Sequence, residues 1–100
     1  MSQTVSIPEK AKGLLVERAM MEVAELEEYS DVSQGRISEI QTAIDRVKNA
    51  NSESVPEQEL KIVVERAEIE YEELQDYSDV NSATLAEIKL AINTAKNTLY

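Results

Sequence analysis

Ser6-Ile7-Pro8-Glu9 occurs a second time, as Ser54-Val55-Pro56-Glu57, 48 positions further along the chain. Other motifs recur at the same offset: Val16-Glu17-Arg18-Ala19 as Val64-Glu65-Arg66-Ala67, and Tyr29-Ser30-Asp31-Val32 as Tyr77-Ser78-Asp79-Val80. The offset continues along the chain without a gap. The sequence is therefore one unit written twice, and we expect the architecture to follow that duplication.

The duplication also indicates the domain organisation. We predict one domain over residues 1–100, with a first copy at 6–49, a linker at 50–53 and a second copy at 54–97. A chain of 100 residues can hold one modest hydrophobic core. Because the chain has four Tyr, no Phe and no Trp, that core should be aliphatic.

The composition excludes several classes of site. The chain contains neither Cys nor His, which excludes disulfides, thiolate or imidazole metal ligands, and Ser–His or Cys–His catalytic pairs. No apolar run is long enough to span a bilayer, and Met1-Ser2-Gln3-Thr4 lacks the features of a signal peptide. We therefore expect a cytoplasmic protein that needs no cofactor.

The charge of the chain limits its partners. The formal net charge is −10, the same sign as nucleic acids and anionic membranes, so direct binding to either is disfavoured. A basic protein surface is the partner that this charge permits. A charge of this size also serves solubility alone.

The local patterns predict four helices and no strands, with the helices at about 7–29, 33–49, 55–77 and 81–98. Ser6-Ile7-Pro8-Glu9 and its copy have the spacing of a capping box, with Pro in the first helical turn. Ser33 and Asn81 are suitable N-caps for the second and fourth helices. Residues 1–5 are expected to be a frayed polar lead.

Short connections force successive helices to run antiparallel. The fold class that we predict is therefore all-α, with two tandem helical hairpins that form a four-helix bundle around a pseudo-two-fold axis. Side-by-side stacking of the hairpins, as in a solenoid, is the alternative, but two repeats are usually too few to make such a stack stable.

Each long helix carries a polar seam between two apolar stripes. The stripes are Leu15, Val16, Ala19, Val23 and Leu26 on one side and Leu14 and Met21 on the other, with equivalents in the second copy. The seam residues are Arg18 and Glu22, copied as Arg66 and Glu70. Because charges that are partly buried are normally paired, we expect these four to be less exposed than the outer acids and to form ion pairs between helices.

The seam also suggests a metal site. Glu22-x-x-Glu25 and Glu70-x-x-Glu73 place two carboxylates on one face of each long helix, and four such groups could hold Mg²⁺ or Mn²⁺. Glu-x-x-Glu resembles the first half of the signature of the all-α nucleoside-triphosphate pyrophosphatases, a resemblance that implies a metal-dependent hydrolase. Their signature continues with Glu-x-x-Asp on the next helix, where this chain has Glu39 followed by Thr42. Since Arg18 and Arg66 would also neutralise the carboxylates, the ion-pair seam is the preferred interpretation.

Acidic residues crowd the C-terminal halves of both long helices. We predict an acidic binding face made of Glu25, Glu28, Asp31, Glu65, Glu68, Glu72, Glu73, Asp76 and Asp79. Acids at a helix C-terminus oppose the helix dipole, and a local rule broken in both copies points toward function. At this density, carboxylates can imitate a phosphate backbone. The alternative is a solvated surface that the duplication retained.

Two apolar residues and two tyrosines stand out on the remaining faces. Met20 and Leu90 fall on outer helix faces, where they are candidates for an apolar contact with a partner or with a second copy in a homodimer. Tyr29 and Tyr77 end the long helices, and we expect them to close the ends of the core with their hydroxyl groups in water.

These patterns favour a non-enzymatic protein-binding module. It would be a small inhibitor or adaptor that docks its acidic face on a basic protein surface, such as one that binds nucleic acid. The alternatives are a self-assembling structural subunit and the Mg²⁺- or Mn²⁺-dependent hydrolase that the resemblance implies.

Overall fold

The computed structural model describes residues 3–100, which form four helices and one small antiparallel sheet. The elements in chain order are β1 (Thr4–Val5), α1 (Glu9–Leu26), α2 (Gln34–Asn49), β2 (Val55–Pro56), α3 (Glu57–Leu74) and α4 (Ser82–Leu99). The prediction of a helical protein with four packed helices is confirmed. None of the helices in this described part combines the length and the apolar character that crossing a membrane requires.

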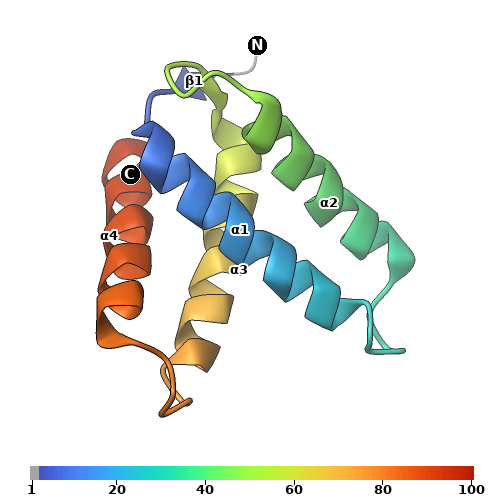
Figure 1. Ribbon diagram of the computed structural model, residues 1–100. Coiled ribbons are helices and arrows are strands. Elements are labelled where there is room, and N and C mark those ends of the chain that lie inside the picture. The colour runs from blue at the N-terminus through green and yellow to red at the C-terminus, as the bar shows by residue number, and fades with distance from the viewer. Residues whose placement is uncertain (1–2) are drawn as a thin grey trace.

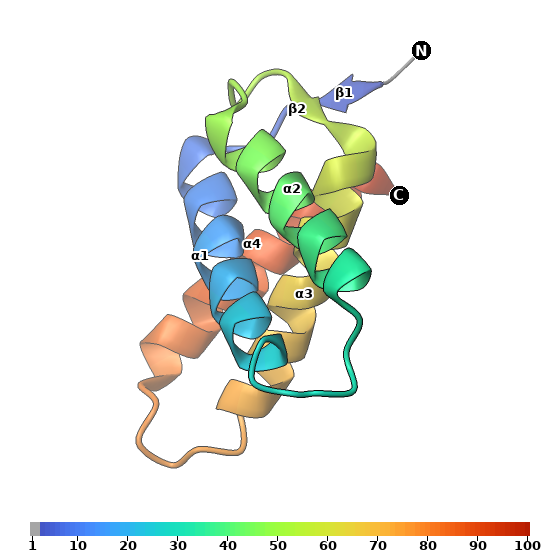
Figure 2. The same ribbon diagram turned by 90° about the vertical axis from the view of Figure 1, so that its right-hand side faces the viewer.

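The two long helices α1 and α3 cross at the centre of the molecule, and α2 and α4 lie on opposite sides of them (Figure 1). Each outer helix packs against both central helices. The loops at 27–33 and 75–81 lie at one end of the molecule, and the two strands lie at the other end (Figure 2). This placement brings the two Tyr-Ser-Asp-Val motifs to the same end.

The core is aliphatic, as predicted, and all four helices contribute to it. One fully buried large side chain comes from each helix: Leu15, Ile40, Leu60 and Ile88. The stripes of small and branched residues at helical spacing produce this core because they place one apolar face of each helix inward. The prediction of the second apolar stripe is confirmed only in part. Leu14 packs against the core, but Met21 is 42% exposed.

The expectation of no strands was wrong. Val5 pairs with Val55 and Thr4 with Pro56 in an antiparallel ladder, and the backbone N–H of Glu57 donates to the carbonyl of Gln3 at 2.9 Å. The expected fraying of residues 1–5 is therefore also wrong for residues 3–5, while Met1 and Ser2 lie outside the described residues. This strand pair depends on tertiary structure, because the linker passes beside the start of the chain. The completely buried Val55 attaches the pair of strands to the core.

The predicted capping boxes do not form. Pro8 and Pro56 occupy the N-cap positions, and neither helix start has a side-chain capping hydrogen bond. Proline disfavours a helical conformation in the residue before it, so the chain stays extended through Ile7 and Val55 and buries both side chains. The helices then begin two residues later than predicted.

The predicted starts of α2 and α4 are confirmed, whereas the predicted ends of α1 and α3 are not. The Ser33 hydroxyl accepts from the N–H of Arg36 at 3.1 Å, and the Asn81 side chain accepts from the N–H of Ala83 at 2.7 Å, so both predicted N-caps are confirmed. The long helices end at Leu26 and Leu74 rather than at residues 29 and 77. Consecutive acids at these ends oppose the helix dipole, which favours an early termination.

Val55 tests the importance of the strand pair. Replacing Val55 with Ala should lower the free energy of unfolding by about 2 kcal/mol, because the lost methyl groups leave a cavity in a closed part of the core. Chemical denaturation followed by circular dichroism measures this. Thr4→Ala, at an exposed position of the same ladder, should cost about 0.5 kcal/mol or less, and equal small losses in both variants would contradict the burial argument.

Candidate functional site

Reciprocal ion pairs join α1 and α3 where the helices cross. The Arg66 guanidinium lies 3.3 Å from the Glu22 carboxylate, and the Arg18 guanidinium lies 3.8 Å from that of Glu70. The two carboxylate side chains are only 4% and 5% exposed. The structure therefore brings together all four residues of the predicted seam, and each α1 residue contacts a residue of α3.

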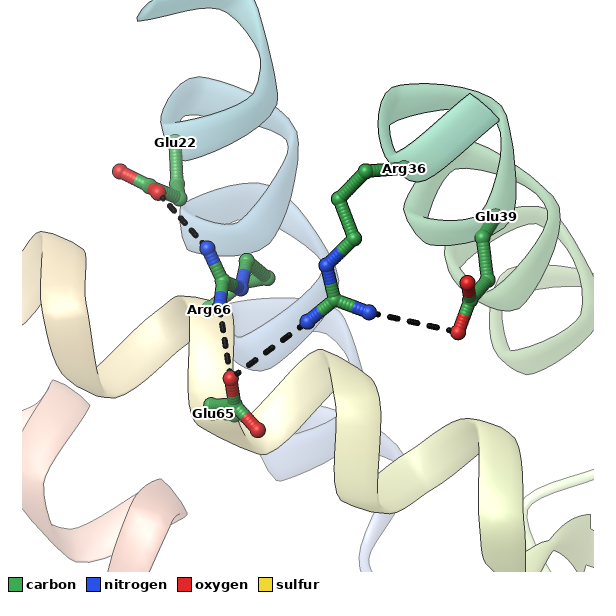
Figure 3. A network of polar contacts seen from close by, with 5 residues as sticks. All are labelled: Glu22, Arg36, Glu39, Glu65 and Arg66. Atoms are coloured by element: carbon green, nitrogen blue, oxygen red, sulfur yellow. Dashed lines mark hydrogen bonds and ion pairs between the residues drawn. The ribbon is translucent and has the colours of Figure 1, made fainter. Parts of the chain in front are cut away.

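One of these pairs continues into a chain of charges across three helices. Arg66 also contacts Glu65 at 2.6 Å, Glu65 contacts Arg36 of α2 at 3.8 Å, and Arg36 contacts Glu39 at 3.3 Å (Figure 3). On the opposite side, Arg18 contacts the exposed Glu17 at 2.6 Å, and the position equivalent to Arg36 is Thr84. Each arginine of the seam is thus shared between a buried and an exposed carboxylate.

Four glutamates form a carboxylate cluster beside these arginines: Glu22, Glu25, Glu70 and Glu73. One oxygen atom from each of Glu22, Glu25 and Glu73 lies within 4.8 Å of the others. Glu70 lies within interaction range of the other three carboxyl groups, and its buried Oε2 has no hydrogen-bond partner. The structure therefore gathers the four residues that the sequence suggested as metal ligands, from the last two turns of α1 and α3.

Burial and crowding raise the pKa of three of these carboxyl groups. For Glu22, burial raises the pKa most, and the nearby charge of Arg66 only partly opposes this. For Glu70, burial again dominates, and the negative charge of Glu73 adds to it. For Glu73, the hydrogen bond shared with Glu25 is the main cause, followed by burial. Ionisation of these carboxyl groups therefore destabilises the folded state.

The nine acids of the predicted binding face separate into three groups. Glu25 and Glu73 belong to the carboxylate cluster. Glu65 and Glu68 are engaged in ion pairs, Glu65 with arginines and Glu68 with Lys96 at 2.6 Å. The remaining five, Glu28, Asp31, Glu72, Asp76 and Asp79, are exposed and form no ion pair within residues 3–100.

These five free acids lie on the last turn of α3 and on the two interhelical loops, and each loop also carries one exposed tyrosine. The two loops lie apart from each other at this end of the molecule (Figure 1). We call this surface the acidic end: Glu28, Tyr29, Asp31, Glu72, Asp76, Tyr77 and Asp79. Tyr29 and Tyr77 are each 59% exposed, so the expectation that they close the core was wrong. The helices end three residues before each tyrosine, which releases the ring from the core into solvent.

The acids of this end do not all oppose a helix dipole. Glu28, Glu72 and Asp76 lie at the C-terminal ends of α1 and α3, where negative charge is unfavourable. Asp31 and Asp79 each come two residues before an N-cap, Ser33 or Asn81, where negative charge is favourable. The predicted electrostatic cost therefore applies to the first three acids only.

The candidate apolar contacts lie on different parts of the surface. Met20 is 48% exposed in a groove bordered by α1 and α2, and Leu90 is 67% exposed in a hollow between α4 and the start of α1. They do not share a hollow. Sequence reasoning missed the buried Lys12, whose ammonium group donates to the carbonyls of Ala50 and Lys48 at the end of α2. The sequence indicates the burial of Lys12 in one way only: the equivalent position in the second copy is Leu60, a core residue.

The carboxylate cluster should make the protein more stable as the pH falls. Folding raises the pKa of Glu22, Glu70 and Glu73 above the ordinary value of 4.5, so the folded state binds these protons more tightly than the unfolded state. The free energy of unfolding should rise as the pH is lowered from 7 toward 5, and this gain is lost as the pH rises through the folded pKa values. Urea titrations in metal-free buffer measure it.

Two glutamine variants locate this effect. Glu73→Gln imitates the protonated side chain, so it should be more stable than the wild type at pH 7 and should gain less on acidification. Glu72→Gln, at the exposed neighbouring position, should keep most of the wild-type gain. If both variants respond to pH alike, the cluster is not the source of the pH dependence.

Comparisons with known proteins give no family for this chain. No protein-family model, no curated protein and no solved structure matches it significantly. What the protein does is therefore inferred from the chemistry of its own surface and its own buried charges.

Proposed function

We propose that this protein is an acidic protein-binding module whose acidic end docks on a basic surface of a protein partner. One observation carries the proposal: the last turn of α3 and the two interhelical loops at one end of the molecule carry five exposed acids that form no ion pair within residues 3–100, together with two exposed tyrosines. The two loops that form this end, 27–33 and 75–81, contain no Lys or Arg.

The composition of the acidic end suits a partner rich in arginine and lysine. Carboxylates form charge-assisted hydrogen bonds with guanidinium and ammonium groups, and tyrosine rings accept cations over their faces. Tyrosine is also enriched in protein interfaces, because one rigid ring supplies a large apolar contact together with a polar hydroxyl. Glu28, Glu72 and Asp76 lie where a helix disfavours them, so a cationic partner would relieve that cost.

The finer form of the proposal is a small inhibitor or adaptor of a nucleic-acid-binding protein. A dense set of carboxylates can occupy a basic groove in place of phosphates, while its own charge keeps the module off nucleic acid itself. A cytoplasmic location is part of this proposal, and it rests on the sequence. The proposed function is binding rather than catalysis.

We further propose that the two hairpins are structural copies related by a pseudo-two-fold axis. Support comes from α1 and α3, whose bounds differ by 48 positions, and from the exchange of partners between Arg18–Glu70 and Arg66–Glu22. Such copies would present two equivalent Tyr-Ser-Asp-Val loops at the same end of the molecule, separated from each other (Figure 1). Two linked contacts to one partner bind more tightly than either contact alone.

Self-assembly is the second candidate, and the exposed Met20, Met21 and Leu90 favour it. Burial of such residues against a second copy would be a hydrophobic contact. High salt should weaken the docking of the acidic end and leave a hydrophobic assembly intact, so the salt dependence separates the two candidates.

A charge-reversal variant tests the acidic end. A pull-down from the host lysate at low salt, with salt elution and mass spectrometry, first identifies the partner. Replacing Glu28, Glu72 and Asp76 with Lys should then slow association with it by about tenfold or more at low salt, because opposite charge steers the encounter. The melting temperature should rise, since Lys suits a helix C-terminus.

The matched control reverses Asp45, Glu53 and Glu87, three exposed acids that are not part of the acidic end. It has the same net charge as the first variant, so any effect of total charge is common to both. Stopped-flow or surface-plasmon measurements compare the two association rates. Equal rates would mean that the acidic end has no special role and serves solubility.

The tyrosines provide a separate test. Tyr29→Ala and Tyr77→Ala should each raise the dissociation constant about tenfold, as truncation of an interface aromatic commonly does, with little change in stability because both rings are exposed. Tyr100→Ala is the control, since that ring is 82% exposed but lies beside Lys61 near the start of α3. Unchanged affinity in the first two variants would remove the tyrosines from the interface.

A further inference from the structure

The carboxylate cluster has the dimensions of a cation site. Oxygen ligands lie about 2.0–2.6 Å from Mg²⁺ or Ca²⁺, so two oxygens on one ion can be no more than about 4–5 Å apart. The oxygens of Glu22, Glu25 and Glu73 lie within 4.8 Å of one another. The 4.8 Å limit exceeds the roughly 4.2 Å that two oxygens can span across Mg²⁺. The carboxylate side chains would therefore close in on an ion by a few tenths of an ångström, while α1 and α3 stay in place.

A second observation at the same place is a buried carboxylate oxygen of Glu70 without a partner, beside the Nε atoms of Arg18 and Arg66, which also lack one. The Glu70 side chain is 5% exposed, and its buried Oε2 has no hydrogen-bond partner, although buried polar atoms are normally satisfied. The other Glu70 oxygen lies 3.8 Å from the Arg18 guanidinium. The free oxygen belongs to a carboxyl group that interacts with Glu22, Glu25 and Glu73, so a cation held by those residues would lie within its reach.

The charges at the crossing of the helices do not balance. Four carboxylates face two guanidinium groups there, which leaves two negative charges uncompensated when all six groups are ionised. Arg18 and Arg66 are moreover shared with Glu17 and Glu65, each at 2.6 Å. The arginines therefore do not neutralise the cluster as the sequence suggested, and Glu25 and Glu73 have no ion-pair partner within the part of the chain that the structure describes.

We propose that the carboxylate cluster binds one divalent cation of the oxygen-preferring class, Mg²⁺ or Mn²⁺, with Glu22, Glu25 and Glu73 as ligands and Glu70 as a fourth ligand or as the acceptor for a metal-bound water. The ligand set contains only carboxylates, which suit hard cations rather than thiolate- or imidazole-preferring ones. A doubly charged ion matches the two uncompensated negative charges.

The ion would tie the last two turns of α1 to those of α3. It would then fix the spacing of the two helix ends from which the loops of the acidic end emerge. This site does not depend on the proposed protein-binding function, because the cluster and the five free acids of the acidic end have no residue in common.

Mn²⁺ titration of the full chain tests the proposal, in a buffer with physiological salt that suppresses loose counterion binding. The decrease of the electron paramagnetic resonance signal of free Mn²⁺ gives the stoichiometry. We expect one site per chain, displacement by Mg²⁺, and a higher melting temperature in the presence of either ion. Glu25→Gln and Glu73→Gln should each weaken binding by about tenfold or more, since changes that only orient a ligand already cost 10–100-fold.

Glu72→Gln is the matched control, because it removes one acid from the adjacent exposed position and should bind Mn²⁺ like the wild type. The glutamine variants should remain folded, and their circular dichroism and melting in metal-free buffer check this. The proposal is overturned if the wild type shows no stoichiometric site. It is equally overturned if Glu25→Gln and Glu73→Gln bind as well as the wild type, or if Glu72→Gln loses as much affinity as they do.

Discussion

The pairing of buried charges at the crossing of α1 and α3 is the constraint on which the rest of the structure depends. Arg18 and Arg66 each pair across the crossing with a glutamate that is almost fully buried. A slip of one helical turn, about 5.4 Å, would separate both pairs and leave charges buried alone, which costs several kcal/mol. The apolar stripes determine that the two helices meet, and the arginines and glutamates determine at which register they do so.

The same crossing carries more negative charge than its arginines balance. Negative charge continues from the carboxylate cluster to the acidic end, because both lie on the last turns of α1 and α3 or on the loops that follow. Natural chains tolerate such violations of local electrostatics mainly where function requires them. A cation in the cluster and a basic partner at the acidic end would each relieve one part of the same repulsion.

The departures from prediction at the starts of the long helices have one physical origin, the prolines that precede these helices. Pro8 and Pro56 keep Ile7 and Val55 extended, so each of these residues enters the core from an extended segment rather than from a helical turn. Antiparallel pairing of Val5 with Val55 then joins the start of the chain to the linker between the copies. Capping boxes were predicted from Ser and Glu spacing alone, without the contact between two segments that are 50 residues apart.

Local sequence patterns were enough to predict the four helices, the N-caps at Ser33 and Asn81, and the aliphatic core, because these depend on spacing over only a few residues. They also named the four cluster glutamates and the seam arginines as neighbours on a helix face. The packing of the helices, which no local pattern encodes, pairs Glu22 with Arg66 rather than Arg18 and leaves a buried oxygen of Glu70 without a partner. It also leaves Tyr29 and Tyr77 exposed to solvent. Those outcomes depend on how two helices about 48 positions apart cross, and helical periodicity contains no information about the position or angle of a crossing.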